Sequence, residues 1–210
     1  MRYLITTPWW LRMFYPKRRW SVATKEKVIF LTFDDGPHPE ATPFVLDELE
    51  KYGAKATFFC IGKNVEAYPK IYGEIISKGH AVGNHTHDHL NGWQTDDSDY
   101  FENIRKAAFL IESALFRPPY GKLRSSQAKS VSGAINAKDP VIVMWSVLSG
   151  DFDTERSPEE CLKGVIDSAK PGSIIVFHDS EKAFSRMKYA LSETLKFFSE
   201  RGYRFEVIKK

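Results

Sequence analysis

The feature of this sequence that most restricts its fold is a regular alternation of short apolar runs with segments of helical periodicity. The apolar runs predict seven strands, over residues 27–33, 56–61, 80–84, 115–117, 141–147, 173–177 and 203–208. Strands that alternate with helices pair in parallel, because a parallel connection needs a crossover that a helix provides. Most of the runs are apolar throughout, as expected for strands covered on both faces. The sequence therefore predicts one α/β domain, either an open doubly wound sheet or a closed barrel.

Composition excludes several other classes of protein. The chain has 210 residues, a net charge of +3 and two cysteines, Cys60 and Cys161. So low a charge does not indicate a nucleic-acid partner, and two cysteines cannot build a disulfide framework. Apolar runs such as residues 141–145 are far shorter than the roughly 20 residues that a membrane-spanning helix requires. No glycine-rich phosphate loop follows the first strand, which argues against a nucleotide-binding sheet.

Polar residues that fit a plain fold poorly all follow predicted strands. They are Asp34-Asp35-Gly36-Pro37, the run from His85 to His89, Arg117-Pro118-Pro119-Tyr120, Asp151, and His178-Asp179. In a parallel α/β barrel the carboxyl ends of the strands meet at one rim, where active sites are built. Each group alone is as easily a turn or a surface feature. Their common placement at strand ends predicts a single site.

The residue types in these groups predict metal-assisted chemistry. Adjacent carboxylates at Asp34 and Asp35 would repel each other in one small site unless a cation lay between them. His85 and His89 are four residues apart and would share a face if the segment formed a helical turn. Two imidazoles and one carboxylate form a known ligand set for Zn²⁺ or Fe²⁺. The second carboxylate can act as general base and His178 as general acid, which favours a hydrolase. A non-haem iron oxygenase uses similar ligands, but no co-substrate signature accompanies them here.

The segment Thr32-Phe33-Asp34-Asp35-Gly36-Pro37 resembles the first signature of the polysaccharide deacetylases, the NodB homology domain of carbohydrate esterase family 4. The resemblance runs from about Lys27 to Ile208 and keeps five family motifs in order. It implies an α/β fold, a distorted (β/α) barrel of about seven parallel strands with surrounding helices. It also implies a metal-dependent hydrolase that removes N-acetyl groups from peptidoglycan-like or chitin-like N-acetylglucosamine.

The resemblance assigns roles to individual residues. Asp34 matches the general base, Arg117 the arginine that orients it, and His178 the general acid. Asp151 matches the partner of that histidine, and the Tyr120 backbone N–H matches an oxyanion donor. The expected metal ligands are Asp35, His85 and His89, holding one divalent ion, Zn²⁺ first, with Co, Fe or Ni as alternatives.

The resemblance also predicts the substrate pocket. Its expected lining residues are Pro118, Tyr120, Phe152 and Val176. Phe152 stands where the family has tryptophan and Val176 where it has leucine, so the fit of the acyl group or sugar is in question. The expected partner is an N-acetylated glycan or amino sugar, bound by a monomer. Two alternatives stay open: hydrolysis of another amide or imide such as a cyclic ureide, and a catalytically silent carbohydrate-binding protein.

Residues 1–25 differ in composition from the rest. They contain six basic and no acidic residues, together with Trp9, Trp10 and Trp20. We expect them to form an extension packed on the catalytic domain of residues 26–210, with the tryptophans covering apolar surface. The alternative is a weak contact with a membrane surface, where basic and aromatic residues lie among headgroups. Because Pro8 and Arg12 interrupt any apolar signal segment, a cytoplasmic location is the default expectation, with action at the cell envelope left open.

Overall fold

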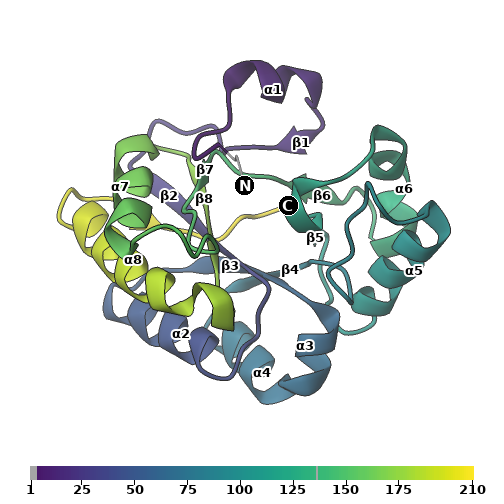
Figure 1. Ribbon diagram of the computed structural model, residues 1–210, viewed down its shortest axis with the longest axis horizontal. Coiled ribbons are helices and arrows are strands. Elements are labelled where there is room, and N and C mark those ends of the chain that lie inside the picture. Colours follow the sequence, from purple (N-terminus) through teal and green to yellow (C-terminus); the bar gives the residue numbers. More distant parts are fainter. Residues whose placement is uncertain (1–3, 136) are drawn as a thin grey trace.

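A curved parallel sheet forms the centre of the protein. The structure is a computed structural model that describes residues 4–135 and 137–210. In the described chain the strands follow the order β1-β6-β5-β4-β3-β2-β8-β7, and β9 pairs with β2 (Figure 1). The strands are β1 (Arg18–Arg19), β2 (Val28–Asp34), β3 (Ala56–Cys60), β4 (Ala81–Asn84), β5 (Leu115–Phe116), β6 (Val141–Val143), β7 (Val147–Leu148), β8 (Ile174–His178) and β9 (Arg204–Phe205).

Helices surround the sheet. They are α1 (Trp9–Phe14), α2 (Ala41–Lys51), α3 (Gly62–Ala67), α4 (Pro69–Ser77), α5 (Asp97–Ala108), the 3₁₀ turn η1 (Pro119–Gly121), α6 (Ser125–Ile135), α7 (Pro158–Ser168) and α8 (Glu181–Ser199). Those from α2 to α8 lie around the outside of the strands (Figure 1). The predicted barrel of parallel strands with surrounding helices is confirmed. Within the described residues, no helix combines the length and the apolar character needed to cross a bilayer.

The prediction of one continuous strand over residues 141–147 is wrong. The chain forms β6, bends, and forms β7; β6 lies next to the end strand β1, whereas β7 is the last strand at the other end of the order. The bend has a tertiary cause. Met144 donates its backbone N–H to Arg19, whereas Ser146 donates its backbone N–H to Ile174 of β8. Residues 144–146 therefore connect a strand near one end of the sheet with the strand at its other end, and the sheet is curved into a distorted half-barrel.

The N-terminal segment lies along this junction. Thr6 forms an antiparallel bridge with Val147, and Leu148 donates its backbone N–H to Ile5. Farther along, β1 pairs in parallel with β6. Residues 5–19 thus contact both halves of the bent strand, and the segment is tied to the barrel by backbone hydrogen bonds.

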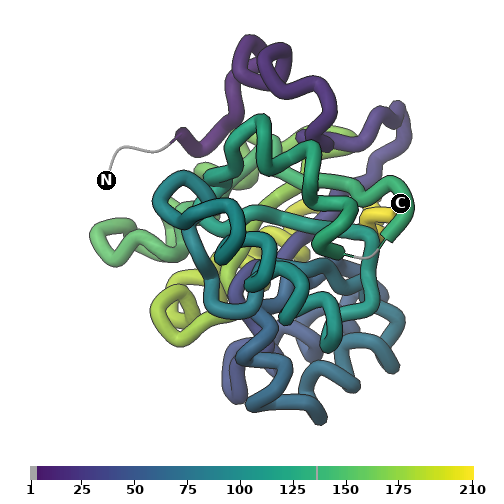
Figure 2. The backbone as a smooth tube through the Cα atoms, turned by 90° about the vertical axis from the view of Figure 1, so that its right-hand side faces the viewer, coloured from purple at the N-terminus to yellow at the C-terminus, as the bar shows by residue number. Residues whose placement is uncertain are grey.

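The tryptophans of the extension do not all behave as expected. Trp20 is buried and packs in a cluster with Tyr100 and Phe116. Trp9 and Trp10 instead remain exposed on α1, a helix with no buried residue. The expectation that the tryptophans cover apolar surface holds for Trp20 and is wrong for the other two. Figure 2 shows the purple N-terminal segment projecting beyond the rest of the molecule.

All residues of strand β2 are buried, but their side chains alternate between the outer core and the interior of the barrel. Ile29, Leu31 and Phe33 pack into the core that α2 and α8 cover. Because side chains alternate along a strand, Thr32 and Asp34 point to the opposite face, the interior of the barrel. The interior is thereby polar at the carboxyl end of β2.

Candidate active site

The first part of the site is an ion pair inside the barrel. Arg117 follows β5 and is fully buried, and its Nη1 donates to Asp34 Oδ1 at 2.6 Å. The same nitrogen donates to Thr32 Oγ1 at 2.8 Å, and the guanidinium lies 4.1 Å from the centre of the Phe59 ring. Burial lowers the pKa of Arg117, and the charge of Asp34 opposes that effect. Arginine stays charged in proteins, so it provides both a countercharge and a fixed position for the Asp34 carboxylate.

The second part is a group of three potential metal ligands. Ligand atoms of Asp35, His85 and His89 all lie within 4.8 Å of one another. Asp35 Oδ1 is 3.8 Å from His85 Nε2 and 3.3 Å from His89 Nε2. Among the described residues, this carboxylate oxygen is buried and has no hydrogen-bond partner. A buried carboxylate oxygen facing two imidazole nitrogens is the environment of a cation site.

The outer nitrogens of both histidines are already engaged. His85 Nδ1 lies 2.7 Å from the Arg117 backbone oxygen, and His89 Nδ1 lies 3.1 Å from Tyr120 Oη. A carbonyl oxygen only accepts, so His85 donates from Nδ1 and keeps the lone pair of Nε2 toward Asp35. Arg117 therefore positions the site twice, with its side chain on Asp34 and with its backbone on His85.

Both histidines are held in the neutral form that binds metals. Burial, followed by the neighbouring His89, lowers the pKa of His85 to about 3. Burial also lowers the pKa of His89, against the opposing charges of Asp35 and Asp34. A neutral imidazole can coordinate without first losing a proton.

The segment from His85 to His89 is not the helical turn that the spacing suggested. Thr86 and His89 have φ of 63° and 58°, and Asp35 and Tyr120 have φ of 84° and 59°. Asn84 Oδ1 accepts the backbone N–H of Thr86 at 2.8 Å and supports the loop. The two imidazoles nevertheless come together, with ring centres 5.1 Å apart. Left-handed backbone at non-glycine residues is costly and collects at functional sites.

The third part is a histidine and aspartate pair. Asp34 and His178 are register partners on neighbouring strands β2 and β8. Asp151 is fully buried, and its Oδ1 lies 2.7 Å from His178 Nδ1. Burial alone would lower the pKa of His178, but Asp151, with smaller contributions from Asp35 and Asp34, raises it to about 9. His178 is accordingly protonated at neutral pH and can donate a proton.

Asp179 is a site residue for which the sequence motifs predict no role. It is fully buried, accepts the backbone N–H of Gly36 at 3.0 Å, and accepts the Thr42 hydroxyl at 2.5 Å. A Cβ on Gly36 would lie 2.1 Å from Asp179, so glycine is required beside Asp35. Asp179 thus fixes the loop that carries the metal ligand. Its position directly after His178 at a strand end was the signal available in the sequence.

The residues expected to line the substrate pocket differ in exposure. Tyr120 is 59% exposed, and the Phe152 ring is half-buried with its centre 5.2 Å from that of His178. Pro118 and Val176 are buried. Val176 lies two residues before His178 on β8, which places both side chains on the same face of the strand. Tyr120 and Phe152 are therefore the members of this set that present surface to a ligand.

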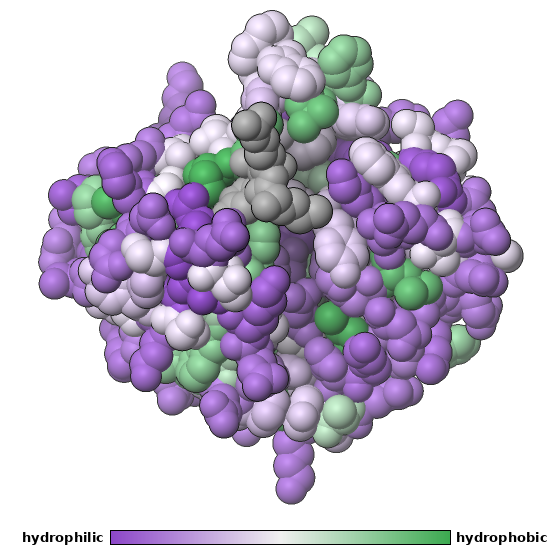
Figure 3. Space-filling view, in the orientation of Figure 1, coloured by the Kyte–Doolittle hydropathy of each residue, from purple (hydrophilic) through white to green (hydrophobic). Residues whose placement is uncertain are grey.

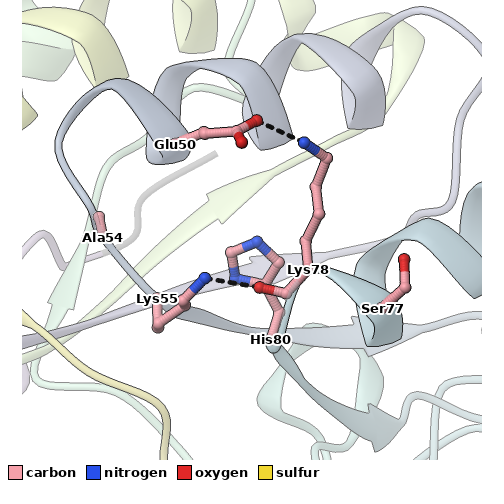
Figure 4. A pocket seen from close by; sticks show the side chains of 6 residues that line it. All are labelled: Glu50, Ala54, Lys55, Ser77, Lys78 and His80. Carbon is pink, nitrogen blue, oxygen red and sulfur yellow. Dashed lines mark hydrogen bonds and ion pairs between the residues drawn. The ribbon is translucent and has the colours of Figure 1, made fainter.

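A cavity of about 270 Å³ lies at the opposite end of the barrel (Figure 4). It is lined by Glu50, Ala54, Lys55, Ser77, Lys78 and His80. Glu50 pairs with Lys78, and Lys55 Nζ donates to the Lys78 backbone oxygen. Burial, with Lys55 and Lys78, lowers the pKa of His80 to about 4. The charged groups that line this cavity are thus already bonded within the cavity wall. The cavity also lies before β3 and β4, whereas the candidate active site lies at the carboxyl ends of the strands.

Comparisons with known proteins agree with this geometry. The family model described as polysaccharide deacetylase matches residues 21–135. A peptidoglycan-N-acetylglucosamine deacetylase of Bacillus cereus is 34% identical over 196 residues, which cover 91% of this chain and 91% of that protein. The chain belongs to the polysaccharide deacetylase family. A chitooligosaccharide deacetylase of Azorhizobium caulinodans is 37% identical over 165 residues, 75% of this chain and 76% of that protein.

A solved structure extends the likeness to the whole fold. It is the crystal structure of the Bc1960 peptidoglycan N-acetylglucosamine deacetylase in complex with 4-naphthalen-1-yl-N-oxidanyl-benzamide. It has a TM-score of 0.86 and 30% sequence identity, and the match covers 96% of this chain and 95% of that chain. Polysaccharide deacetylases are metal-dependent hydrolases of carbon–nitrogen bonds other than peptide bonds, and Asp35, His85 and His89 offer the ion a site.

Proposed function

We propose that this deacetylase removes N-acetyl groups from N-acetylglucosamine units of a peptidoglycan-like or chitin-like glycan. One observation carries the proposal: two ion pairs, Asp34 with Arg117 and Asp151 with His178, lie with a three-ligand group at the carboxyl ends of the strands. A base and an acid beside a cation site are what metal-assisted amide hydrolysis requires. The relatives from Bacillus cereus and Azorhizobium caulinodans are a peptidoglycan-N-acetylglucosamine deacetylase and a chitooligosaccharide deacetylase, which supports this choice of substrate.

We infer that Asp35, His85 and His89 hold one Zn²⁺. Two imidazole nitrogens and one carboxylate oxygen are a common catalytic zinc set, whereas Co, Fe and Ni accept the same donors. The unpartnered Asp35 oxygen supports a cation there. When bound, the ion supplies Lewis-acid activation of water and of the amide carbonyl.

The chain's own residues supply the proton transfers. Asp34, held by Arg117, takes the proton of the attacking water as general base. His178, kept charged by Asp151, gives its proton to the departing sugar nitrogen. The amide carbon–nitrogen bond breaks, and acetate and a free amine leave. The backbone N–H of Tyr120 is the proposed donor to the oxyanion, a role worth about 2.7–4 kcal/mol where it has been measured.

Acetate release from N-acetylglucosamine oligomers and from peptidoglycan tests the proposal. Activity should be lost on chelation and return with Zn²⁺ or Co²⁺. Asp34→Asn should lose turnover and keep the metal, whereas Asp35→Ala should lose the metal. The exposed Asp99→Asn is a matched control that should change neither. Turnover that survives chelation would overturn the metal role. Ring-opening hydrolysis of a cyclic ureide, together with no acetate release from any glycan, would overturn the substrate class.

The monomeric state and the cytoplasmic location expected from the sequence stay predictions. Sedimentation velocity tests the first, and cell fractionation tests the second. Both measurements use the full chain.

A further inference from the structure

Helix α1 presents an unusually apolar outer surface. Trp9 is 72% exposed, Trp10 50%, Met13 69% and Phe14 73%. Residues four apart share a helix face, so Trp9 lies with Met13 and Trp10 with Phe14. The rings of Trp10 and Phe14 are in edge contact, with centres 6.5 Å apart. We call these four residues the α1 patch. Pale and green atoms gather on this projection at the top of Figure 3, in contrast with the mostly hydrophilic face below it.

The α1 patch is held outward by the residues at its base. Thr7 Oγ1 donates to the Trp145 backbone oxygen at 2.8 Å, and Arg12 Nη2 donates to the Thr7 backbone oxygen at 3.1 Å. After the helix, the Trp20 indole N–H donates to the Tyr15 backbone oxygen at 3.2 Å. The helix is therefore anchored at both ends, while its own residues contribute nothing to the core. Contiguous exposed apolar patches often mark interaction sites, and the α1 patch is a patch of this kind.

The segment that carries the α1 patch has basic side chains and no acidic ones. Residues 1–25 contain no acidic residue. Lys17 and Lys25 are exposed, and Arg19 Nη1 donates to the backbone oxygen of Lys209. The C-terminal lysines thus lie beside the basic turn that follows α1. Tryptophans next to cations suit the headgroup layer of an anionic bilayer, where indoles insert and lysines neutralise phosphates.

From these observations we propose that the α1 patch docks the enzyme on a lipid bilayer that contains anionic phospholipid. The side chains of α1 favour lipid over glycan. A sugar platform needs acceptors and amides beside its aromatic rings to bind hydroxyl groups, whereas the polar side chain of α1, Arg12, already bonds to the backbone. The absence of acidic residues in the segment also favours an anionic partner.

Vesicle sedimentation of the full chain tests the proposal. Wild-type protein should bind vesicles of phosphatidylglycerol and phosphatidylcholine, and it should bind phosphatidylcholine alone more weakly. Trp9→Ser with Trp10→Ser should reduce the partition constant about tenfold or more. Lys17→Glu with Lys25→Glu should weaken binding to anionic vesicles and make it less sensitive to salt. Phe109→Ser changes an aromatic residue outside α1 that is even more exposed, at 90%, and it should have no effect.

A second measurement keeps the test decisive if the variant with both Trp9→Ser and Trp10→Ser does not fold. In the wild-type protein, brominated lipid should quench tryptophan fluorescence, and Met13→Ser with Phe14→Ser should reduce that quenching. Acetate release from soluble oligomers should be the same for all of these variants. The proposal is overturned if wild-type protein does not bind anionic vesicles or binds them independently of α1. It is also overturned if the α1 variants lose binding to insoluble glycan, or lose a dimer, instead of vesicle binding.

Discussion

Asp151 holds His178 through both of its carboxylate oxygens: Oδ1 lies 2.7 Å from Nδ1, and Oδ2 accepts the backbone N–H at 2.8 Å. The second bond fixes the end of β8, and the first orients the ring. Nε2 is thereby left as the nitrogen from which a proton can reach the substrate. The pKa of about 9 means that this proton is present throughout the neutral range.

Asp151→Asn should remove most of this effect. Without the carboxylate, burial dominates and the pKa of His178 falls well below 9. The alkaline limb of the kcat profile should move to lower pH, and kcat at pH 7 should fall about 100-fold or more.

Because the pKa of His178 is raised from 6.5, its pairing with Asp151 stabilises the fold fully below about pH 6.5 and loses that effect as pH rises through 9. Imidazole NMR and urea unfolding across this range check both points; an unmoved alkaline limb would contradict the assignment of the acid.

Arg117→Met should destabilise the protein strongly. The substitution leaves the Asp34 carboxylate, which is 4% exposed, without its cation. Removing one partner of a buried ion pair costs about 3–5 kcal/mol. Arg105→Met is the matched control, because Arg105 pairs with Glu102 on the surface and should change stability by less than about 1 kcal/mol. Urea unfolding with a chelator present measures the two free energies. Equal effects would show that burial of the pair does not govern its contribution.

Zinc should stabilise the folded protein through Asp35, His85 and His89. An ion at 100 times its dissociation constant adds about 2.7 kcal/mol to the free energy of unfolding. The thermal midpoint of wild-type protein should rise on adding Zn²⁺ and fall again with chelator. His85→Ala should lose the response, whereas His38→Ala, outside the ligand group, should keep it. A response that persists in His85→Ala would place the ion elsewhere.

The site was predictable from sequence because its residues occupy strand ends. Asp34, Arg117 and His178 each follow or end an apolar run, and parallel pairing brings such ends together. What the pattern could not supply was the local backbone. The positive φ of Thr86 is supported by Asn84, whose amide is itself held by donating to the Ile104 backbone oxygen, a contact that the local pattern does not predict.

The fold was predictable where a strand was defined by its own residues. The bend between β6 and β7 was not, because Val141 to Val147 is apolar at both ends and the division depends on different hydrogen-bond partners. Strand β1 could not be predicted either, since Arg18 and Arg19 have no strand-like pattern. They form a strand because they pair with the edge of β6. Helix α1 keeps its apolar residues outside, against the rule from which burial is predicted.

Asp179→Asn should change stability in a pH-dependent manner. Burial, together with the charge of Asp35, raises the pKa of Asp179 to about 8, against hydrogen bonds from Thr42 and Gly36 that lower it. The ordinary value is 3.8, so the folded protein binds a proton that the unfolded chain releases between about pH 4 and pH 8. This contribution is fully present below about pH 4 and is lost as pH rises through 8, whereas asparagine stays neutral.

Between pH 5 and pH 9 the free energy of unfolding of Asp179→Asn should therefore rise by at least about 1 kcal/mol relative to that of the wild type. Urea unfolding in chelator measures the difference, and Asp99→Asn controls for loss of an exposed carboxylate. A difference that does not vary with pH would mean that Asp179 is ionised throughout and that the loop is held by its charge.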